Sequence, residues 1–269
     1  MTMATFASSY LLLQLLGALL RPAQTKPNSL YYSNPQCGPL LTGKISINLI
    51  WYGKFKPSQR AIVSDFITSL SSSSPSKHQP SVATWLKSIE KYYYLSNAKK
   101  TSSLSLSLGT QILDESYSLG KSEATGGQSN AINVVLTSSD VIIDGFFSSK
   151  CGTHGYSRSS FLRGKSSKFA YIWVSRVSLH LGRKLRDPVP WSMCLAIPSA
   201  NLWTTISSFG WAASACPGVY GKGAHPDYAG DLLVDATTGA SYNANGFNGK
   251  KYLLPALFDP STSTCSTLV

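Results

Sequence analysis

The segment "KISINLIWYG", Lys44 to Gly53, decides how the rest of this sequence is interpreted. Apolar and polar residues alternate at its start, β-branched and aromatic residues then run together, and a glycine ends the run. This pattern is typical of a strand that is buried in the middle of a sheet. We therefore expect a central strand at Ile45 to Tyr52.

Two amphipathic helices are predicted after this strand. In "PSQRAIVSDFITSL", which begins at Pro57, the proline suits the first helical turn and the apolar residues recur on one face. A Ser/Pro-rich loop follows. Ser81 is then suited to cap a second helix, "VATWLKSIEKYYYL", which has its own apolar stripe.

Strand patterns continue beyond the helices. Leucine alternates with polar residues from position 104 to 108, which indicates a half-buried strand at a sheet edge. Apolar runs predict further strands at Ile132 to Thr137, Val141 to Ile143 and Phe169 to Val174. Strands that first alternate with helices and then follow one another closely predict an α+β fold, with a central mixed β-sheet covered by helices.

The C-terminal part has a different composition. From Ala213 onward glycine, asparagine, tyrosine and proline dominate, and these residues favour turns. We expect a coil-rich cap stabilised by Cys216 and Cys265.

Length and charge limit the classes of protein to consider. A chain of 269 residues can form one large domain, and its net charge of +12 attracts anions of any kind. Lysine and arginine are scattered rather than gathered in one stripe. A generally basic surface is therefore favoured over a nucleic-acid site.

The N-terminus predicts export. The apolar run from Phe6 to Leu20 is shorter than the roughly 20 residues of a membrane span, and Arg21 and small residues suited to cleavage follow it. We expect a secretory signal peptide at residues 1–24 and a single mature domain at residues 25–269. No later segment is long and apolar enough to anchor the protein in a membrane.

If the protein is exported, its five cysteines are expected to form disulfides rather than to act as metal ligands or nucleophiles. They are Cys37, Cys151, Cys194, Cys216 and Cys265. The number is odd, so at least one is unpaired or bonded to another chain, and about fifteen arrangements of two bonds are open.

The sequence "KCGTHGYSR", Lys150 to Arg158, contains the most reactive pair of side chains. A cysteine with a histidine three residues later can form a thiolate and its base, because a nearby imidazolium lowers the pKa of a thiol. In an oxidising compartment the thiol is instead expected to form a disulfide. We therefore interpret Cys151 and His154 as a disulfide-anchored turn, with a functional role as the less favoured reading.

No other pattern assigns a catalytic residue, a metal site or a cofactor. The four histidines show no HExxH motif and no paired spacing, and CxxC, GxSxG, P-loop and GxGxxG motifs are missing. Surface positions or turn capping explain the carboxylates that stand outside the predicted helices. They include Asp114, Glu115, Asp140, Asp144, Asp231 and Asp235.

Several long blocks resemble the plant EXORDIUM-like, phosphate-induced protein family. They include "GPLLTGKISINLIWYGKFKPSQRAIVSDFITSL", "NAINVVLTSSDV", "CGTHG" and the region from "ASACPGVYGKGAHPDYAG" to the C-terminus. The resemblance implies a plant protein exported to the apoplast or cell wall, of a family tied to brassinosteroid-promoted growth and cell expansion.

Residues 175–211 depart from that family's pattern. They lack its cysteine pair and its apolar helix, and Trp211 stands where a glutamate is expected. We expect this segment to pack poorly and interpret it as altered splicing or a shifted reading frame, with a natural isoform as the alternative.

The function expected from the residues and the resemblance together is non-enzymatic. The protein would bind an acidic wall polysaccharide or a surface receptor, without nucleic acid and without a cofactor. The alternative is a degenerate secreted hydrolase similar to zinc metallopeptidases, using Cys151 or His154. Among the cysteine arrangements we favour Cys216 with Cys265, and Cys151 with either Cys37 or Cys194.

Overall fold

The computed structural model of the chain describes residues 43–71, 78–88, 104–118, 131–142, 152–159, 167–174, 216–259 and 261–269. Within these ranges the elements are β1 (Gly43–Tyr52), α2 (Pro57–Leu70), α3 (Val82–Lys87), β2 (Leu104–Asp114), β3 (Ala131–Thr137), β4 (Gly152–Ser159), β5 (Ser167–Val174), β6 (Leu233–Val234), β7 (Ser241–Tyr242), β8 (Ala244–Asn245), β9 (Lys251–Tyr252), β10 (Leu257–Asp259) and β11 (Thr264–Ser266).

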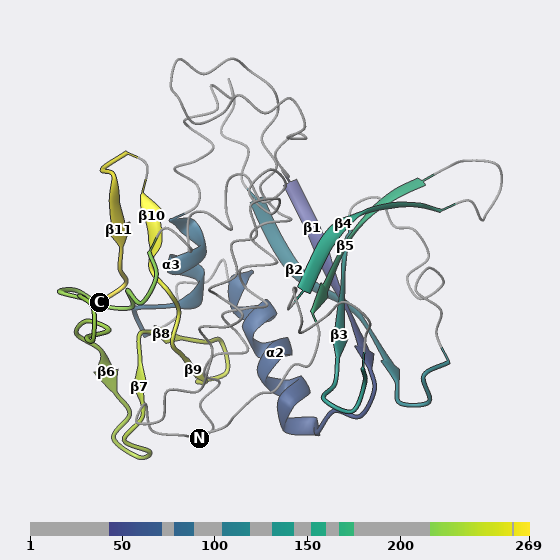
Figure 1. Cartoon of the computed structure of the whole chain (residues 1–269), viewed down its shortest axis with the longest axis horizontal. Coiled ribbons are helices and arrows are strands. Elements are labelled where there is room, and N and C mark those ends of the chain that lie inside the picture. Colours follow the sequence, from purple (N-terminus) through teal and green to yellow (C-terminus); the bar gives the residue numbers. More distant parts are fainter. Residues whose placement is uncertain are drawn as a thin grey trace.

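The central sheet has the strand order β2-β1-β3-β5-β4 (Figure 1). Strand β1 pairs in parallel with both β2 and β3, and β3 pairs in parallel with β5. Strand β4 is antiparallel to β5, so the sheet is mixed, as predicted. The central place of β1 and the edge place of β2 are also confirmed.

The two helices begin where the sequence predicts. Pro57 is the first residue of α2, and the Gln59 side chain accepts a hydrogen bond of 2.8 Å from the Lys56 N–H. Ser81 caps α3, because its Oγ accepts the Thr84 N–H at 3.2 Å. Helix α3 is described as far as Lys87, so the rest of the predicted second helix lies outside the described residues.

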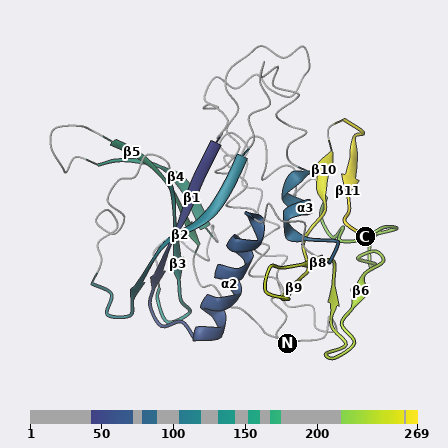
Figure 2. The ribbon, with the colours of Figure 1, turned by 180° about the vertical axis from the view of Figure 1, so that it is seen from behind.

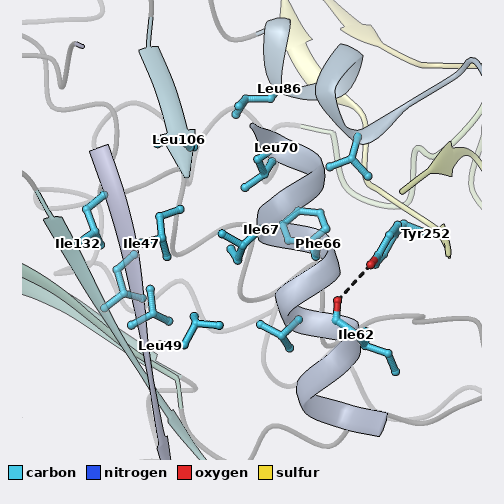
Figure 3. Packing of buried hydrophobic residues seen from close by; sticks show 14 of the residues in the cluster. Ile47, Leu49, Ile62, Phe66, Ile67, Leu70, Leu86, Leu106, Ile132 and Tyr252 are labelled. Atoms are coloured by element: carbon cyan, nitrogen blue, oxygen red, sulfur yellow. Dashed lines mark hydrogen bonds between the residues drawn. The ribbon is translucent and has the colours of Figure 1, made fainter. Parts of the chain in front are cut away.

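The core lies between one face of the sheet and α2 (Figure 3). Alternate residues of β1 point into it, because side chains of a strand alternate between its faces. The buried cluster takes Ile47 and Leu49 from β1, Leu106 from β2, Ile132 from β3, and Ile62, Phe66, Ile67 and Leu70 from α2. The predicted helical stripe and the predicted strands therefore meet in one core.

The opposite face of β1 carries a buried polar pair. The Asn48 amide N–H donates to the Asn133 Oδ1 at 2.9 Å, and Asn48 Oδ1 accepts the Thr110 N–H at 3.0 Å. The latter bond lies where the register of β1 against β2 shifts. Gly109 is required there, because a Cβ would lie 2.3 Å from Asn48 Oδ1.

The C-terminal part is a cap of short strands and turns, as predicted. A disulfide joins Cys216 to Cys265 across 49 residues, which is the pair that the sequence favoured. Inside the cap, the buried Asn243 amide donates to the Tyr220 and Leu254 carbonyls at 2.8 and 2.7 Å, and its Oδ1 accepts the Leu254 N–H at 2.7 Å. One side chain thus holds three backbone groups of the cap.

The cap is joined to α2 through a buried carboxylate, Asp65. The Tyr252 hydroxyl donates to Asp65 Oδ2 at 2.6 Å, and the Asn248 N–H donates to Oδ1 at 2.9 Å. The Phe247 N–H also donates to Ser69 Oγ at 2.8 Å. Burial, together with the Asp65 charge, raises the pKa of the Tyr252 phenol, so this hydroxyl remains a donor. Figures 1 and 2 show the resulting order of layers: sheet, helices, cap.

Two expectations need qualification. The predicted strand at Val141 to Ile143 is wrong for its first two residues, which follow a turn after β3 and lie outside any strand; Ile143 lies outside the described residues. The turn forms because the Val141 N–H donates to the Ser138 carbonyl at 3.3 Å. The α+β class is supported in outline, by a central, largely parallel sheet with few helices and a disulfide-linked cap.

The junction between α2 and the cap can be tested with Tyr252→Phe. The change removes the hydroxyl that Asp65 accepts, so the free energy of unfolding should fall by about 1–3 kcal/mol, measured by urea denaturation. The matched control is Tyr228→Phe, which removes a similar bond from the Tyr228 hydroxyl to Asp231 at the exposed surface. If both variants lose the same stability, the buried junction does not have the role assigned to it.

Candidate functional site

The carboxyl ends of β1, β2 and β3 lie side by side at one edge of the sheet. The Gly53 N–H donates to the Asp114 carbonyl at 2.9 Å, and the Ser138 N–H donates to the Tyr52 carbonyl at 3.0 Å. Strands β2 and β3 lie on opposite sides of β1, so the strand order reverses here. In open sheets with parallel strands, ligands bind outside the carboxyl ends of the strands at such a reversal.

A carboxylate, Asp140, organises the end of β3. The hydroxyls of Ser138 and Tyr117 both donate to it, one to each oxygen. These two hydrogen bonds lower the pKa of Asp140 from 3.8 to about 2, and the bond from Ser138 has the larger effect. In return, the bond to Asp140 raises the pKa of the Tyr117 phenol, which therefore stays protonated.

Tyr117 is held in place by two further features. Its backbone has a φ of 59°, in the left-handed region that non-glycine residues seldom adopt. Its ring forms a T-shaped pair with the Tyr52 ring, with centroids 5.6 Å apart and an angle of 74° between the planes. The turn that carries it is capped by Asp114, whose Oδ1 accepts the Ser118 N–H at 2.9 Å.

Gly53 allows these strand ends to approach. Its φ is +100°, and a Cβ at this position would lie 2.1 Å from Ser138 Oγ. Only glycine fits this conformation and this spacing. The edge also extends toward β5, because the Trp173 indole N–H donates to Thr137 Oγ1 at 2.8 Å.

The meeting of these residues at one sheet edge was not predicted from the sequence, although roles for its two aspartates were. The sequence indicated surface positions or turn capping for Asp114 and Asp140; Asp114 caps a turn, whereas Asp140 accepts the hydroxyls of Ser138 and Tyr117. The sequence did not predict that they lie at the same sheet edge, because 25 residues and a separate strand pairing stand between them. A glycine directly after one strand, an acid at the end of a second and another acid three residues after a third form the signal that could have indicated the edge.

The turn predicted at Cys151 and His154 is wrong in one respect. Residues 152–159 form strand β4, in which His154 stands opposite Ile172 of β5. The antiparallel ladder satisfies backbone groups along the whole segment, which a local turn would not do. Cys151 itself lies outside the described residues, as do Cys37 and Cys194, so their pairing and any role of Cys151 stay predictions.

Metal ligands do not gather in the described part of the chain. Within those ranges, no three side chains of histidine, cysteine, aspartate or glutamate come together as a metal ion requires. None of the helices there has the length and apolar character needed to cross a bilayer.

Several carboxylates are buried, which affects the surface charge. Of the eight acidic residues that the structure describes, four are buried: Asp65, Asp114, Asp235 and Asp259. Lys251 and Thr238 hold the pKa of Asp235 well below its usual range through their hydrogen bonds. Lys54, Lys56 and Lys222 are exposed.

Comparison with known proteins gives one family. The family model described as phosphate-induced protein 1 conserved region matches residues 34–180 and 205–268. The unmatched residues 181–204 fall inside the segment that the sequence identified as atypical, 175–211. Those residues lie outside the described part of the structure.

Relatives from plants match most of the chain. Protein PHOSPHATE-INDUCED 1 of Nicotiana tabacum is 56% identical over 273 residues, which cover 86% of this chain and 87% of the relative. Protein EXORDIUM of Arabidopsis thaliana is 51% identical over 303 residues, 96% of each chain. Protein EXORDIUM-like 1 of the same plant is 48% identical, with 99% and 100% covered. No solved structure has significant similarity to the chain.

The hydrogen bonds of Asp140 predict a pH-dependent contribution to stability. Its folded pKa, about 2, is below the ordinary 3.8, so the contribution is present above about pH 4 and is lost as the pH falls toward 2. The difference in unfolding free energy between wild type and Asp140→Asn should therefore shrink across this window, measured by urea denaturation. Ser138→Ala removes the hydrogen bond that lowers the Asp140 pKa most. The pH range over which the stability difference changes should therefore become narrower. A difference that is constant with pH would contradict the assignment.

Proposed function

The chain belongs to the phosphate-induced protein 1 family, which includes EXORDIUM, and from this we propose that it is a secreted, non-enzymatic protein of the apoplast or cell wall. It acts by binding a component of the wall or of the cell surface. Through this binding it takes part in brassinosteroid-dependent growth and cell expansion.

The bound component that fits the charge best is an acidic wall polysaccharide. The chain carries a net charge of +12, with 24 basic and 12 acidic residues. In the part of the chain that the structure describes, four of the eight carboxylates are buried and hydrogen-bonded, so cations are the more numerous charges exposed there. This distribution of charge is the observation that carries the proposal, since a basic surface concentrates polyanions near it.

The attachment is expected to be distributed over the surface. Exposed charges interact through water, where salt screens them over about 10 Å at 0.1 M ionic strength. Each exposed lysine therefore contributes little alone, and the sum of many gives a reversible attachment. A surface of this kind retains a protein in the wall without holding it at one fixed position.

Export can be tested by expressing the full chain in plant cells. The predicted signal peptide, residues 1–24, should be removed, so the protein from the extracellular fluid should begin near residue 25. N-terminal sequencing or mass spectrometry measures this directly. Recovery of the uncleaved chain in the cytosol alone would contradict the proposal.

Polyanion binding predicts a strong dependence on salt. Affinity for demethylated pectin, measured by biolayer interferometry, should fall about tenfold between low salt and about 0.5 M salt. Replacing Lys54, Lys56 and Lys222 by glutamine should weaken binding at low salt, because all three are exposed. The matched control replaces the same lysines by arginine, which keeps the charge. Binding that ignores both salt and the glutamine changes would rule out the electrostatic mechanism.

A further inference from the structure

We propose that the exposed ring of Tyr117, at the carboxyl ends of β1, β2 and β3, is a platform on which a neutral wall sugar stacks. The inference shares with the proposed function only the extracellular setting. It assigns binding to one aromatic ring rather than to distributed charge, and to a ligand of different chemistry, so each can fail while the other holds.

The ring is presented to solvent rather than used by the core. The Tyr117 side chain is 42% exposed and does not belong to the buried cluster. It stands at the reversal of strand order, where sheets with parallel strands bind their ligands. An exposed aromatic ring at this place is better explained by a ligand than by packing.

The ring is also fixed before any ligand binds. Its hydroxyl is bonded to Asp140, its ring makes a T-shaped contact with Tyr52, and its backbone is held in a left-handed conformation by the turn that Asp114 caps. Since the side chain is already ordered, binding costs little conformational entropy. The axial C–H groups of a hexose ring form a flat apolar face, which suits an immobile aromatic plane.

The charges around the ring favour a neutral sugar over an acidic one. Asp140 stays ionised at any wall pH, because its pKa is about 2, and Glu115 is exposed nearby in the same turn. Lys54, which follows Gly53, is the exposed cation adjacent to this edge in the chain. Among these described residues, a polyuronate would meet two anions and one cation.

The chain contains a closely matched control for Tyr117. Tyr228 in the cap is also 42% exposed, donates its hydroxyl to Asp231 at 2.6 Å, and packs against a second ring, His225, at 5.4 Å. It lies in a turn between His225 and Asp231 of the cap, away from the strand ends of the central sheet. A loss of sugar binding on replacing either tyrosine would therefore reflect exposed aromatic rings in general rather than the site at Tyr117.

The test is calorimetric titration of the full secreted protein with cellopentaose, a neutral glucose oligomer, and with oligogalacturonate, in about 0.5 M salt to screen the basic surface. Cellopentaose should bind the wild type, and Tyr117→Ala should weaken it by about five- to tenfold. Tyr117→Trp should retain binding, and Tyr228→Ala should match the wild type. Thermal unfolding of each variant checks that it is folded.

A second measurement needs no variant. Hydroxyl-radical footprinting of the wild type should show that cellopentaose protects Tyr117 and leaves Tyr228 as reactive as before. Absence of cellopentaose binding, equal losses in Tyr117→Ala and Tyr228→Ala, or an unprotected Tyr117 would each overturn the inference. If the wild type binds cellopentaose but does not bind pectin in low salt, only the proposed electrostatic attachment is contradicted.

Discussion

The structure depends on one constraint, the parallel pairing of β1 with a neighbour on each side. A parallel neighbour cannot be reached by a tight turn, so the chain must cross one face of the sheet before it returns as β2. Helix α2 lies on that face and covers the apolar side chains of β1, and α3 packs against α2. The next part of the chain, β3, pairs on the other side of β1. This reversal places the ends of β2 and β3 beside the end of β1 and so brings Asp114, Tyr117 and Asp140 together.

The same crossing helix links the sheet to the cap. Its inner side packs on β1 and its outer side offers Asp65 to Tyr252 and to the Asn248 N–H. A buried carboxylate is stable only when donors surround it, and here the donors come from the far end of the chain. Residues about 187 positions apart are thereby held against each other, which makes the short strands of the cap part of one unit with the sheet.

Local patterns carried most of what could be predicted. The run from Ile45, the stripe of α2 and the alternation in β2 each depend on near neighbours in sequence, and each was found where expected. The segment after Cys151 and the residues from Val141 were misjudged, because their conformation depends on whether a distant strand is available as a partner. The sheet edge was missed for the same reason: Asp114, Tyr117 and Asp140 meet only once the strand order is known.

Two bonds hold the last described residues against the rest of the cap. The Cys265 sulfur is joined to Cys216, and the carbonyl of Val269 accepts the Lys222 N–H at 2.9 Å. Residues 265–269 therefore cannot separate from residues 216–222 while the disulfide is intact. Because the bridge spans 49 residues, reducing it would free both ends of the cap at once.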